Sequence, residues 1–379
     1  MNKNIYLDHA ATTPMNEEVI KTMTKAMENH YENPSSIHQL GKKNHVLIEQ
    51  ARERMAESIG AKAEEIVITS GGTESDNMAI IKTAEKYRYR GNHIISTMIE
   101  HPAVLNPLKK LEEKDFEVTY LPADKNGQIK LEELKKAIRP DTILISVMYV
   151  NNEVGSLQPI KEIGQFLSNE HPEIIFHTDA VQAYGILNID VEELNVDLLS
   201  VSAHKMNGPK GIGFLYIRKG LKLDALLLGG AQENERRGGT ENLPAILAFA
   251  KAIEINEENK VKQYEKISKL KEYFIKSLEA TEINYSINCE NKDNAPHILS
   301  ISFEEIKSEL LLIQLDLNNI AVSAGSACTA GSLEDSHVLQ SIFGDKAREV
   351  KHTIRFSFGA SNSYEEIDRV IEKLKKYAK

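Results

Sequence analysis

The sequence predicts an α/β protein with a large domain, built on a mostly parallel seven-stranded sheet flanked by helices, and a smaller C-terminal α+β domain. Seven short apolar runs, rich in β-branched residues, alternate with helical patterns between about residues 60 and 220. Strands that are apolar throughout and separated by helices are typical of a parallel sheet covered on both faces. The chain also has 379 residues, which exceeds the length that one hydrophobic core usually serves.

The seven expected strands leave room for a helix between most of them. They cover residues 65–69, 93–97, 116–121, 142–150, 173–179, 197–203 and 211–219. A short turn joins the last two runs, so this pair is compatible with an antiparallel arrangement.

The rest of the chain has a different pattern. One long helical stretch covers about residues 240–280, and strands are expected at 297–303 and 353–359, followed by an amphipathic helix. We therefore expect an N-terminal arm over residues 1–14 that packs on the small domain, a large domain over 15–255 and a small C-terminal domain over 256–379.

The composition limits the classes of partner. Hydrophobic residues make up 41% and charged residues 27% of the chain, as in soluble globular proteins. A net charge of −10 argues against a nucleic-acid surface spread over the fold. The start lacks the apolar segment of a signal peptide, and no run approaches the ~18 apolar residues of a membrane span. We expect a cytoplasmic protein without direct contacts to nucleic acid or membrane.

The two cysteines lie in different contexts. They are too few for a disulfide framework and are expected to be thiols. Cys289 follows a strand-like stretch and is interpreted as structural. Cys328 lies in "VSAGSACTAGS", a run of small residues that tolerates turns and predicts a flexible loop. A thiol in such a loop is either accidental or a nucleophile that has to move.

Several strand ends carry groups capable of chemistry. In open α/β sheets, ligands bind beyond the carboxyl ends of the strands. After the strand at 65–69 come Gly71, Gly72 and Thr73 and then a helical pattern, which together form a candidate phosphate cup. An ordinary strand-to-helix turn is the alternative. His101 precedes Pro102 at an expected helix start, where a simple turn residue is also compatible.

The two strands that follow suggest a cofactor. Asp179 and Gln182 follow one apolar run, and Ser202, His204 and Lys205 follow the next. A helix cap and a surface lysine are the alternatives, but a lysine at the end of a buried strand is costly unless it is neutralised or bonded. A phosphate cup, a carboxylate for a pyridinium nitrogen and a lysine for a Schiff base are together what pyridoxal 5'-phosphate requires.

Ten motifs then resemble, in order, those of cysteine desulfurases of the NifS/IscS type, which are pyridoxal-phosphate enzymes of fold type I in the class V aminotransferase group. The resemblance runs from residue 5 to about 360. The motifs are "YLDHAATTP", "NPSSIH", "TSGGTESDN", "IEHPAV", "NNEVG", "HTDAVQ", "SVSAHKMNGPKGIGFLY", "RRGGTEN", "SAGSACTAGS" and "IRFSFG".

The resemblance implies how the cofactor is held. Lys205 would bind it covalently and later move the substrate's α-proton. Asp179 would pair with the ring nitrogen, Gln182 would bond the ring hydroxyl, and His101 would stack on the ring and assist proton transfer. Asn152 would lie beside the ring. The phosphate ligands would be Gly72, Thr73, Ser202 and His204, with Thr240 from the partner subunit of a homodimer.

The resemblance also implies the reaction. Arg355 would bind the carboxylate of L-cysteine through two parallel hydrogen bonds. Cys328 would take the substrate's sulfur as a persulfide while L-alanine leaves. The persulfide would then supply an acceptor protein, either an iron–sulfur scaffold or a tRNA thiolase. Members that serve an iron–sulfur scaffold usually have a longer C-terminal extension, so the acceptor stays open. His9 replaces an asparagine that is frequent in the family, with little consequence expected.

Other functions fit parts of the sequence. A selenocysteine lyase or another aminotransferase-fold enzyme would have the same cofactor site, although an aminotransferase does not need the Cys328 loop. A non-enzymatic sulfur-relay scaffold would not need Lys205, Asp179 and Arg355 together. A metal-dependent hydrolase is disfavoured because the twelve histidines are scattered, without HExxH or Cys-x-x-Cys spacing.

Overall fold

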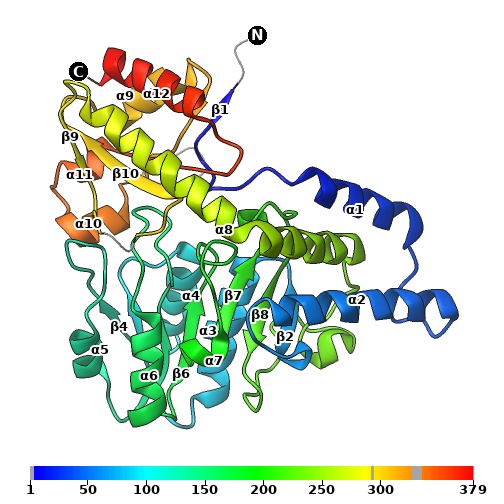
Figure 1. Cartoon of the computed structure of the whole chain (residues 1–379). Helices are drawn as coiled ribbons and strands as arrows, with labels where there is room; N and C mark the ends of the chain where they lie inside the picture. Colours follow the sequence, from blue (N-terminus) through cyan, green and yellow to red (C-terminus); the bar gives the residue numbers. More distant parts are fainter. Residues whose placement is uncertain (1–3, 292–293, 326–334, 379) are drawn as a thin grey trace.

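The computed structural model describes residues 4–291, 294–325 and 335–378 (Figure 1). The large sheet has seven strands, of which only β8 runs in the opposite direction to the other six. Their order across the sheet is β2 (Ile66–Thr69), β8 (Gly213–Ile217), β7 (Leu198–Ser202), β6 (Ile175–Asp179), β5 (Thr142–Ser146), β3 (His93–Thr97) and β4 (Glu117–Leu121). The predicted seven-stranded, mostly parallel sheet and the antiparallel pair are confirmed.

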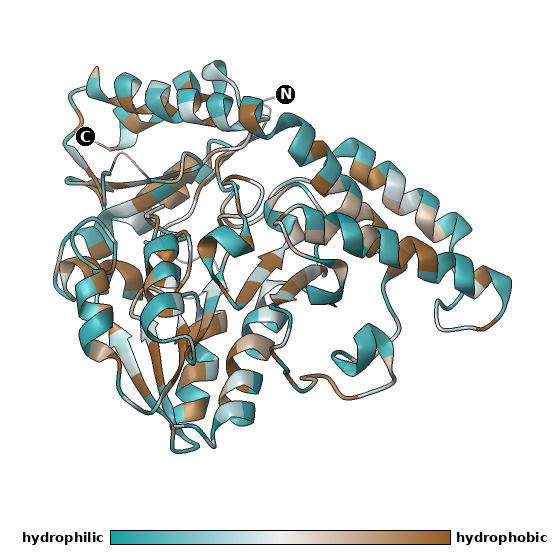
Figure 2. Ribbon diagram, turned by 60° about the horizontal axis from the view of Figure 1, so that its bottom comes forward, coloured by the Kyte–Doolittle hydropathy of each residue, from teal (hydrophilic) through white to brown (hydrophobic). Residues whose placement is uncertain are grey.

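Neighbouring residues of a strand pack on opposite faces of the large sheet, because side chains alternate across a sheet, and β2 shows this pattern. Val67 packs against α3 (Gly72–Tyr87) and α4 (Pro102–Glu112), whereas Ile66 and Ile68 face α2 (Gln39–Glu57) and the first part of α8 (Leu243–Glu279). Both faces are therefore apolar and covered, and Figure 2 shows the strands as a hydrophobic interior between more polar helices.

A second hydrophobic core lies at the other end of the molecule. It forms around a three-stranded antiparallel sheet of β9 (Tyr285–Ile287), β10 (Ile298–Phe303) and β12 (Thr353–Ser357). Helices α9 (Ser308–Asp316) and α12 (Tyr364–Tyr377) cover it. The N-terminal arm reaches this core, where β1 (Ile5–Tyr6) pairs with β11 (Ile320–Ala321).

Helix α8 belongs to both cores. Its residues up to Ile253 pack against the large sheet, and those from Ile267 to Leu278 pack in the second core. The predicted domain boundary at residue 255 thus lies within one continuous helix, which Figure 1 shows crossing from one part of the molecule to the other.

The remaining elements are short or peripheral. The α-helices are α1 (Glu17–Asn29), α5 (Leu131–Ala137), α6 (Ile160–Glu170), α7 (Val191–Leu194), α10 (His337–Phe343) and α11 (Glu349–His352). The 3-10 turns are η1 (Ala63–Glu65), η2 (Ala203–Lys205) and η3 (Gln232–Glu235).

The strand expected at residues 142–150 is shorter than its apolar run. The run extends to residue 150, but β5 ends at Ser146. Beyond it the chain turns at Asn151, whose side-chain oxygen accepts hydrogen bonds from the backbone N–H groups of Glu153 and Val154 at 2.9 Å. A side chain that bonds nearby backbone groups favours a turn over a strand.

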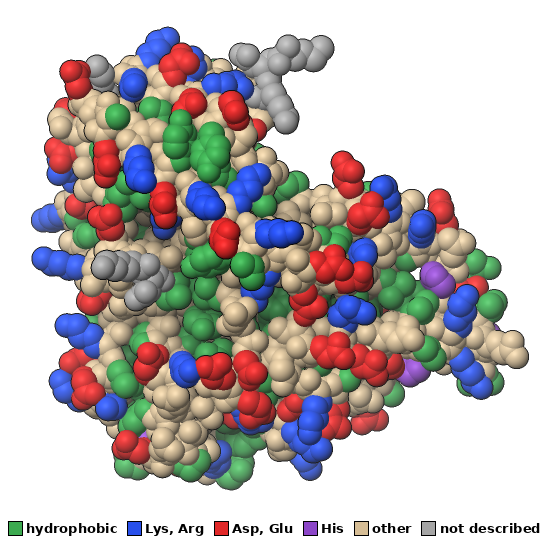
Figure 3. Space-filling model, in the orientation of Figure 1, with side chains coloured by type: hydrophobic (Ala, Val, Ile, Leu, Met, Phe, Trp, Pro, Cys, Tyr) green, Lys and Arg blue, Asp and Glu red, His purple; other side chains and the backbone are tan. Residues whose placement is uncertain are grey.

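The surface carries both signs of charge. On the face shown in Figure 3, Lys and Arg side chains are interspersed with Asp and Glu. Among the helices of the described residues, none has both the length and the apolar character that crossing a membrane requires.

Candidate active site

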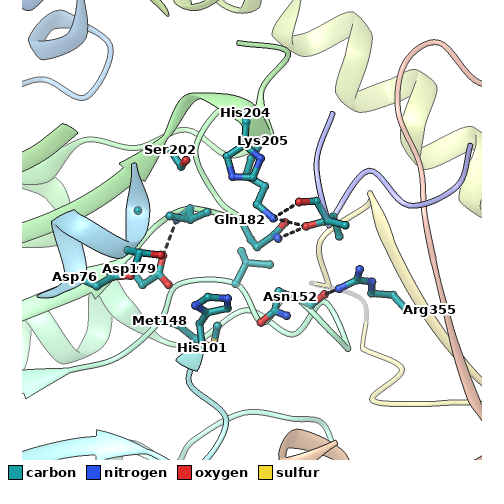
Figure 4. Close-up of a pocket in the computed structure, with 16 residues that line it drawn as sticks. Asp76, His101, Met148, Asn152, Asp179, Gln182, Ser202, His204, Lys205 and Arg355 are labelled. Atoms are coloured by element: carbon teal, nitrogen blue, oxygen red, sulfur yellow. Dashed lines mark hydrogen bonds between the residues drawn. The ribbon is translucent and has the colours of Figure 1, made fainter. Parts of the chain in front are cut away.

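A cavity of about 190 Å³ opens where the carboxyl ends of the large sheet meet the second core (Figure 4). Ten predicted site residues line it: Gly72, Thr73, His101, Asn152, Asp179, Gln182, Ser202, His204, Lys205 and Arg355. They come from six separate segments of the chain, and the fold brings them together.

The turn between β2 and α3 forms one end of the cavity. Helix α3 begins at Gly72, and a Cβ atom there would lie 2.6 Å from Cγ2 of Val181, so only glycine fits without a shift. The first N–H groups of a helix have no intrahelical partner and favour anions. Thr73, Ser202 and His204 lie around the same hollow. Burial lowers the pKa of His204 to about 4, and the charge of Lys205 adds to this effect.

Asp179 also lines the cavity, as the last residue of β6. Its side-chain oxygen accepts a hydrogen bond from the backbone N–H of Val181 at 2.9 Å. Burial raises the pKa of Asp179 to about 6 despite this bond. A cation placed beside this carboxylate would offset the cost of its burial.

Two further buried acids, for which no role is predicted from the sequence, lie near Asp179. Asp76 lines the cavity, and burial together with the charge of Asp179 raises its pKa well above the usual value. Glu100 lies behind the cavity, accepts a hydrogen bond from the backbone N–H of Met148 at 2.9 Å, and has its pKa raised by burial to about 8. The position of Asp76, one helical turn after Gly72, is a signal in the sequence that could have found it.

Lys205 lies in η2, directly after β7. Its Nζ donates hydrogen bonds to the carbonyl oxygens of Ala10 and Ala11 in the N-terminal arm, the latter at 2.9 Å. Nε2 of Gln182 donates to the same Ala10 oxygen at 2.9 Å, as the dashed lines of Figure 4 show. The arm therefore bonds to both Lys205 and Gln182, two residues that are predicted to bind the cofactor.

His101 combines a structural position with a place in the cavity. It is the N-cap of α4, where its Nδ1 accepts from the backbone N–H of Ala103 at 3.1 Å. The simple helix-start interpretation is therefore correct for its backbone. Burial lowers the pKa of His101 to about 4, and the charges of Lys205 and His337 act in the same direction. At neutral pH the ring is uncharged and can accept a proton.

Arg355 enters the cavity from β12 of the second core and is 2% exposed. Its Nη2 pairs with Oδ1 of Asp8 at 2.8 Å, and its Nη1 donates to the carbonyl oxygen of Asn152 at 2.8 Å. Asp8 also accepts from the hydroxyl of Ser323 at 2.9 Å. Asp8 is a third residue with no predicted role, because nothing local links it to position 355.

One predicted site residue lies outside this cavity. Thr240 lies in a separate hollow with Ser70, Gly211 and Arg237. Cys328 lies outside the described residues. The other cysteine, Cys289, is buried, and burial raises its thiol pKa to about 12. Cys289 therefore stays a thiol at neutral pH, in line with its interpretation as structural.

The geometry combines an anion-binding helix start, a buried carboxylate, a lysine amine, a neutral imidazole and a guanidinium around one cavity. A family profile described as Aminotransferase class-V matches residues 5–370. The chain belongs to the class-V aminotransferase family.

Named relatives and solved structures show which proteins of this family the chain is similar to. The chain is 45% identical to the cysteine desulfurase IscS of Dictyoglomus turgidum, over 99% of this chain and 96% of that protein. A solved NifS-like protein is 36% identical and superposes with a TM-score of 0.92, covering 99% of both chains. SspA, solved in complex with cysteine, is 38% identical with a TM-score of 0.83 and covers 95% of this chain and 100% of that one.

Enzymes of this family use pyridoxal 5'-phosphate, and the cavity suits that cofactor. The absent Cβ of Gly72 leaves room for a group at the start of α3. The raised pKa of Asp179 marks a buried carboxylate that a protonated ring nitrogen would stabilise. Within the described residues, no three His, Cys, Asp or Glu side chains form a group that could hold a metal ion.

Proposed function

We propose that this chain is a cysteine desulfurase that converts L-cysteine to L-alanine and retains the sulfur as a persulfide on Cys328. One observation carries this proposal: Lys205, Asp179 and Arg355 line a single cavity although Arg355 comes from the second core. This arrangement suits an amino acid whose carboxylate binds at one end and whose amine reacts at the other. Full-length similarity to cysteine desulfurases supports the choice of reaction.

The cofactor-binding roles are those that the family resemblance implies, and the presence of these residues around one cavity supports them. When bound, pyridoxal 5'-phosphate withdraws electrons from the bonds at the substrate's α-carbon. Lys205 would hold it covalently, and Asp179 would keep its ring nitrogen protonated. Gln182 would donate a hydrogen bond to the ring hydroxyl oxygen, and Asn152 would lie beside the ring. Gly72, Thr73, Ser202 and His204 would hold the phosphate.

Substrate binding and proton transfer use three side chains. Arg355 binds the substrate carboxylate, and its contact with Asp8 holds the guanidinium in place at 2.8 Å. Lys205 would move the α-proton. His101 would stack on the ring and, being neutral, could accept and return a proton during the reaction.

Sulfur transfer needs a nucleophile that can leave the cavity. The Cys328 thiolate attacks the substrate sulfur, so that a sulfur–sulfur bond forms and the carbon–sulfur bond breaks. The electron pair of the broken bond stays with the carbon, which takes up a proton, and L-alanine leaves. Sulfur is then passed to an acceptor protein, for which an iron–sulfur scaffold and a tRNA thiolase are the two candidates.

The experiment that tests this proposal compares the two cysteines. We expect Cys328→Ser to retain bound cofactor but to lose both alanine production and protein-bound persulfide, because the acceptor is gone. Cys289→Ser is the matched control and is expected to retain both products. Alanine and persulfide are measured after adding L-cysteine to each purified holoenzyme. Persulfide formation by the Cys328→Ser protein would refute the assignment.

A further inference from the structure

His297 contacts Gln182 from the side of the second core. Nε2 of His297 lies 3.2 Å from Oε1 of Gln182, and both residues are buried, with exposed fractions of 6% and 7%. His297 directly precedes β10, whereas Gln182 follows β6 of the large sheet. The contact therefore links the two cores immediately beside the cavity.

Hydrogen-bond chemistry sets the orientation of the Gln182 amide. Its Oε1 can only accept and its Nε2 can only donate. Nε2 donates to the carbonyl oxygen of Ala10 at 2.9 Å, and Oε1 faces His297. Both contacts require the same orientation of the amide. They leave the second N–H of Nε2 available to a group in the cavity.

The His297 ring is neutral and carries its one proton on the nitrogen that faces Gln182. Burial lowers its pKa to about 3. The ionisable side chains that lower it further are Lys271, His9, Lys205 and Arg355. Because Oε1 of Gln182 cannot donate, Nε2 of His297 must carry the proton. Its Nδ1 has no hydrogen-bond partner among the described residues, so Gln182 is the one side chain that this ring is placed to hold.

We propose that His297 is a positioning residue that fixes the Gln182 amide so that Nε2 donates a hydrogen bond to the ring hydroxyl oxygen of the cofactor. This inference rests on the proposed function, which assigns that contact to Gln182. A donor at this oxygen favours the cofactor form with more negative charge there, which is the deprotonated form. Loss of the donor, or of its orientation, therefore raises the pH at which the visible absorbance of the bound cofactor changes.

A purely structural role makes a different prediction. If His297 only fills space between the two cores, its replacement changes the stability of the protein and leaves the absorbance midpoint where it was. His297→Leu removes the donor at similar volume, and His297→Gln restores a donor with similar reach. His9→Asn is the matched control, because His9 lines the same small cavity as His297 but makes no hydrogen bond to Gln182 among the described residues.

The experiment uses the full-length protein reconstituted with pyridoxal 5'-phosphate. For each variant, the cofactor's Kd and the pH midpoint of its visible absorbance are measured. We expect His297→Leu to weaken cofactor binding about 2- to 10-fold, the range of one neutral hydrogen bond, and to raise the midpoint. His297→Gln is expected to restore most of both values, and His9→Asn to change neither. The double variant Gln182→Leu/His297→Leu should be no worse than Gln182→Leu, because His297 acts through Gln182.

The outcomes separate this inference from the proposal on which it rests. If Gln182→Leu changes neither Kd nor midpoint, the assigned role of Gln182 is wrong. If Gln182→Leu changes both but His297→Leu changes neither, the role of His297 alone is overturned. Additive effects in the double variant, or a failure of His297→Gln to restore binding, also overturn it.

Discussion

Lys205 and Lys210 lie five positions apart but have different surroundings. Lys205 is half-buried and bonds to carbonyl groups of the arm, whereas Lys210 is exposed in the turn before β8. Around the cavity, burial shifts each pKa in the direction that favours the uncharged form. His101 and His204 therefore stay uncharged, and Glu100 stays protonated, at neutral pH. At the scale of single residues, solvent exclusion decides which groups can do chemistry.

The two lysines give the first prediction. We expect Lys205→Ala to lose all activity and the covalent link to the cofactor, because no other described lysine lines the cavity. Lys210→Ala should retain both. Borohydride reduction of the holoenzyme followed by peptide mass analysis identifies the attached residue. A reduced adduct on Lys210 would place the site elsewhere.

Glu100 gives a prediction about pH. Its pKa is raised from 4.5 to about 8 in the folded protein, so the folded state holds its proton more tightly than the unfolded state does. Stability is therefore full below the unfolded pKa and falls as pH rises through about 8. Asp76 and Asp179 act in the same direction.

The measurement is urea unfolding of the protein without cofactor, between about pH 5 and pH 9. Glu100→Gln keeps an uncharged side chain of the same shape and should reduce the loss of stability over this range. An unchanged pH profile in the variant would mean that Glu100 is ionised in the folded protein.

At the scale of elements, the cavity depends on where strands end and helices begin. The β2–α3 turn places the start of α3 against Val181, which follows β6, and Gly72 allows this close approach. The arm that contains β1 adds the carbonyl groups of Ala10 and Ala11 from the opposite side. The site is thus made by the ends of several elements, each held by its own packing.

Gly72→Ala tests this arrangement. The added Cβ would lie 2.6 Å from Cγ2 of Val181, so α3 must shift and the phosphate hollow must change shape. Overpacking of this kind costs about 1–3 kcal/mol, and we expect weaker cofactor binding by roughly 10-fold. Equilibrium dialysis with pyridoxal 5'-phosphate measures it. Val181→Ala in the same protein removes the atom that the new Cβ meets and should restore binding, and no recovery would count against the steric explanation.

At the scale of the whole molecule, two cores share one site. Arg355 reaches the cavity from the second core, and helix α8 runs through both. Thr240 does not line the cavity of its own chain. We propose that it completes the phosphate site of the partner subunit in a homodimer. A solvent-exposed loop before α8 is the alternative.

Mixed dimers test the shared site. We expect Thr240→Ala to weaken cofactor binding by roughly 1.5–3 kcal/mol, the value of one hydrogen bond to a charged group. When it is mixed with Lys205→Ala, each hybrid dimer would have one site with both changes and one with neither. Activity recovered on mixing, measured as alanine production at limiting cofactor, supports the shared site. A fully active monomer in sedimentation would rule it out.

Much of the fold and site could be predicted because the responsible signals are local. Asp179 and Ser202 end neighbouring parallel strands, and η2 places Lys205 just beyond Ser202, so short apolar runs and the residues after them predict a common edge. Strand β5 ends earlier than its apolar run predicts, because the run continues toward a turn that Asn151 stabilises.

What the sequence did not reveal depends on contacts between distant segments. Arg355 meets Asp8 across 347 positions, and His297 meets Gln182 across 115. The protonation of Asp76 and Glu100 depends on how completely the packed chain excludes water from them. No local pattern carries this information, because pairing across the fold and the depth of burial exist only once both cores have packed around the cavity.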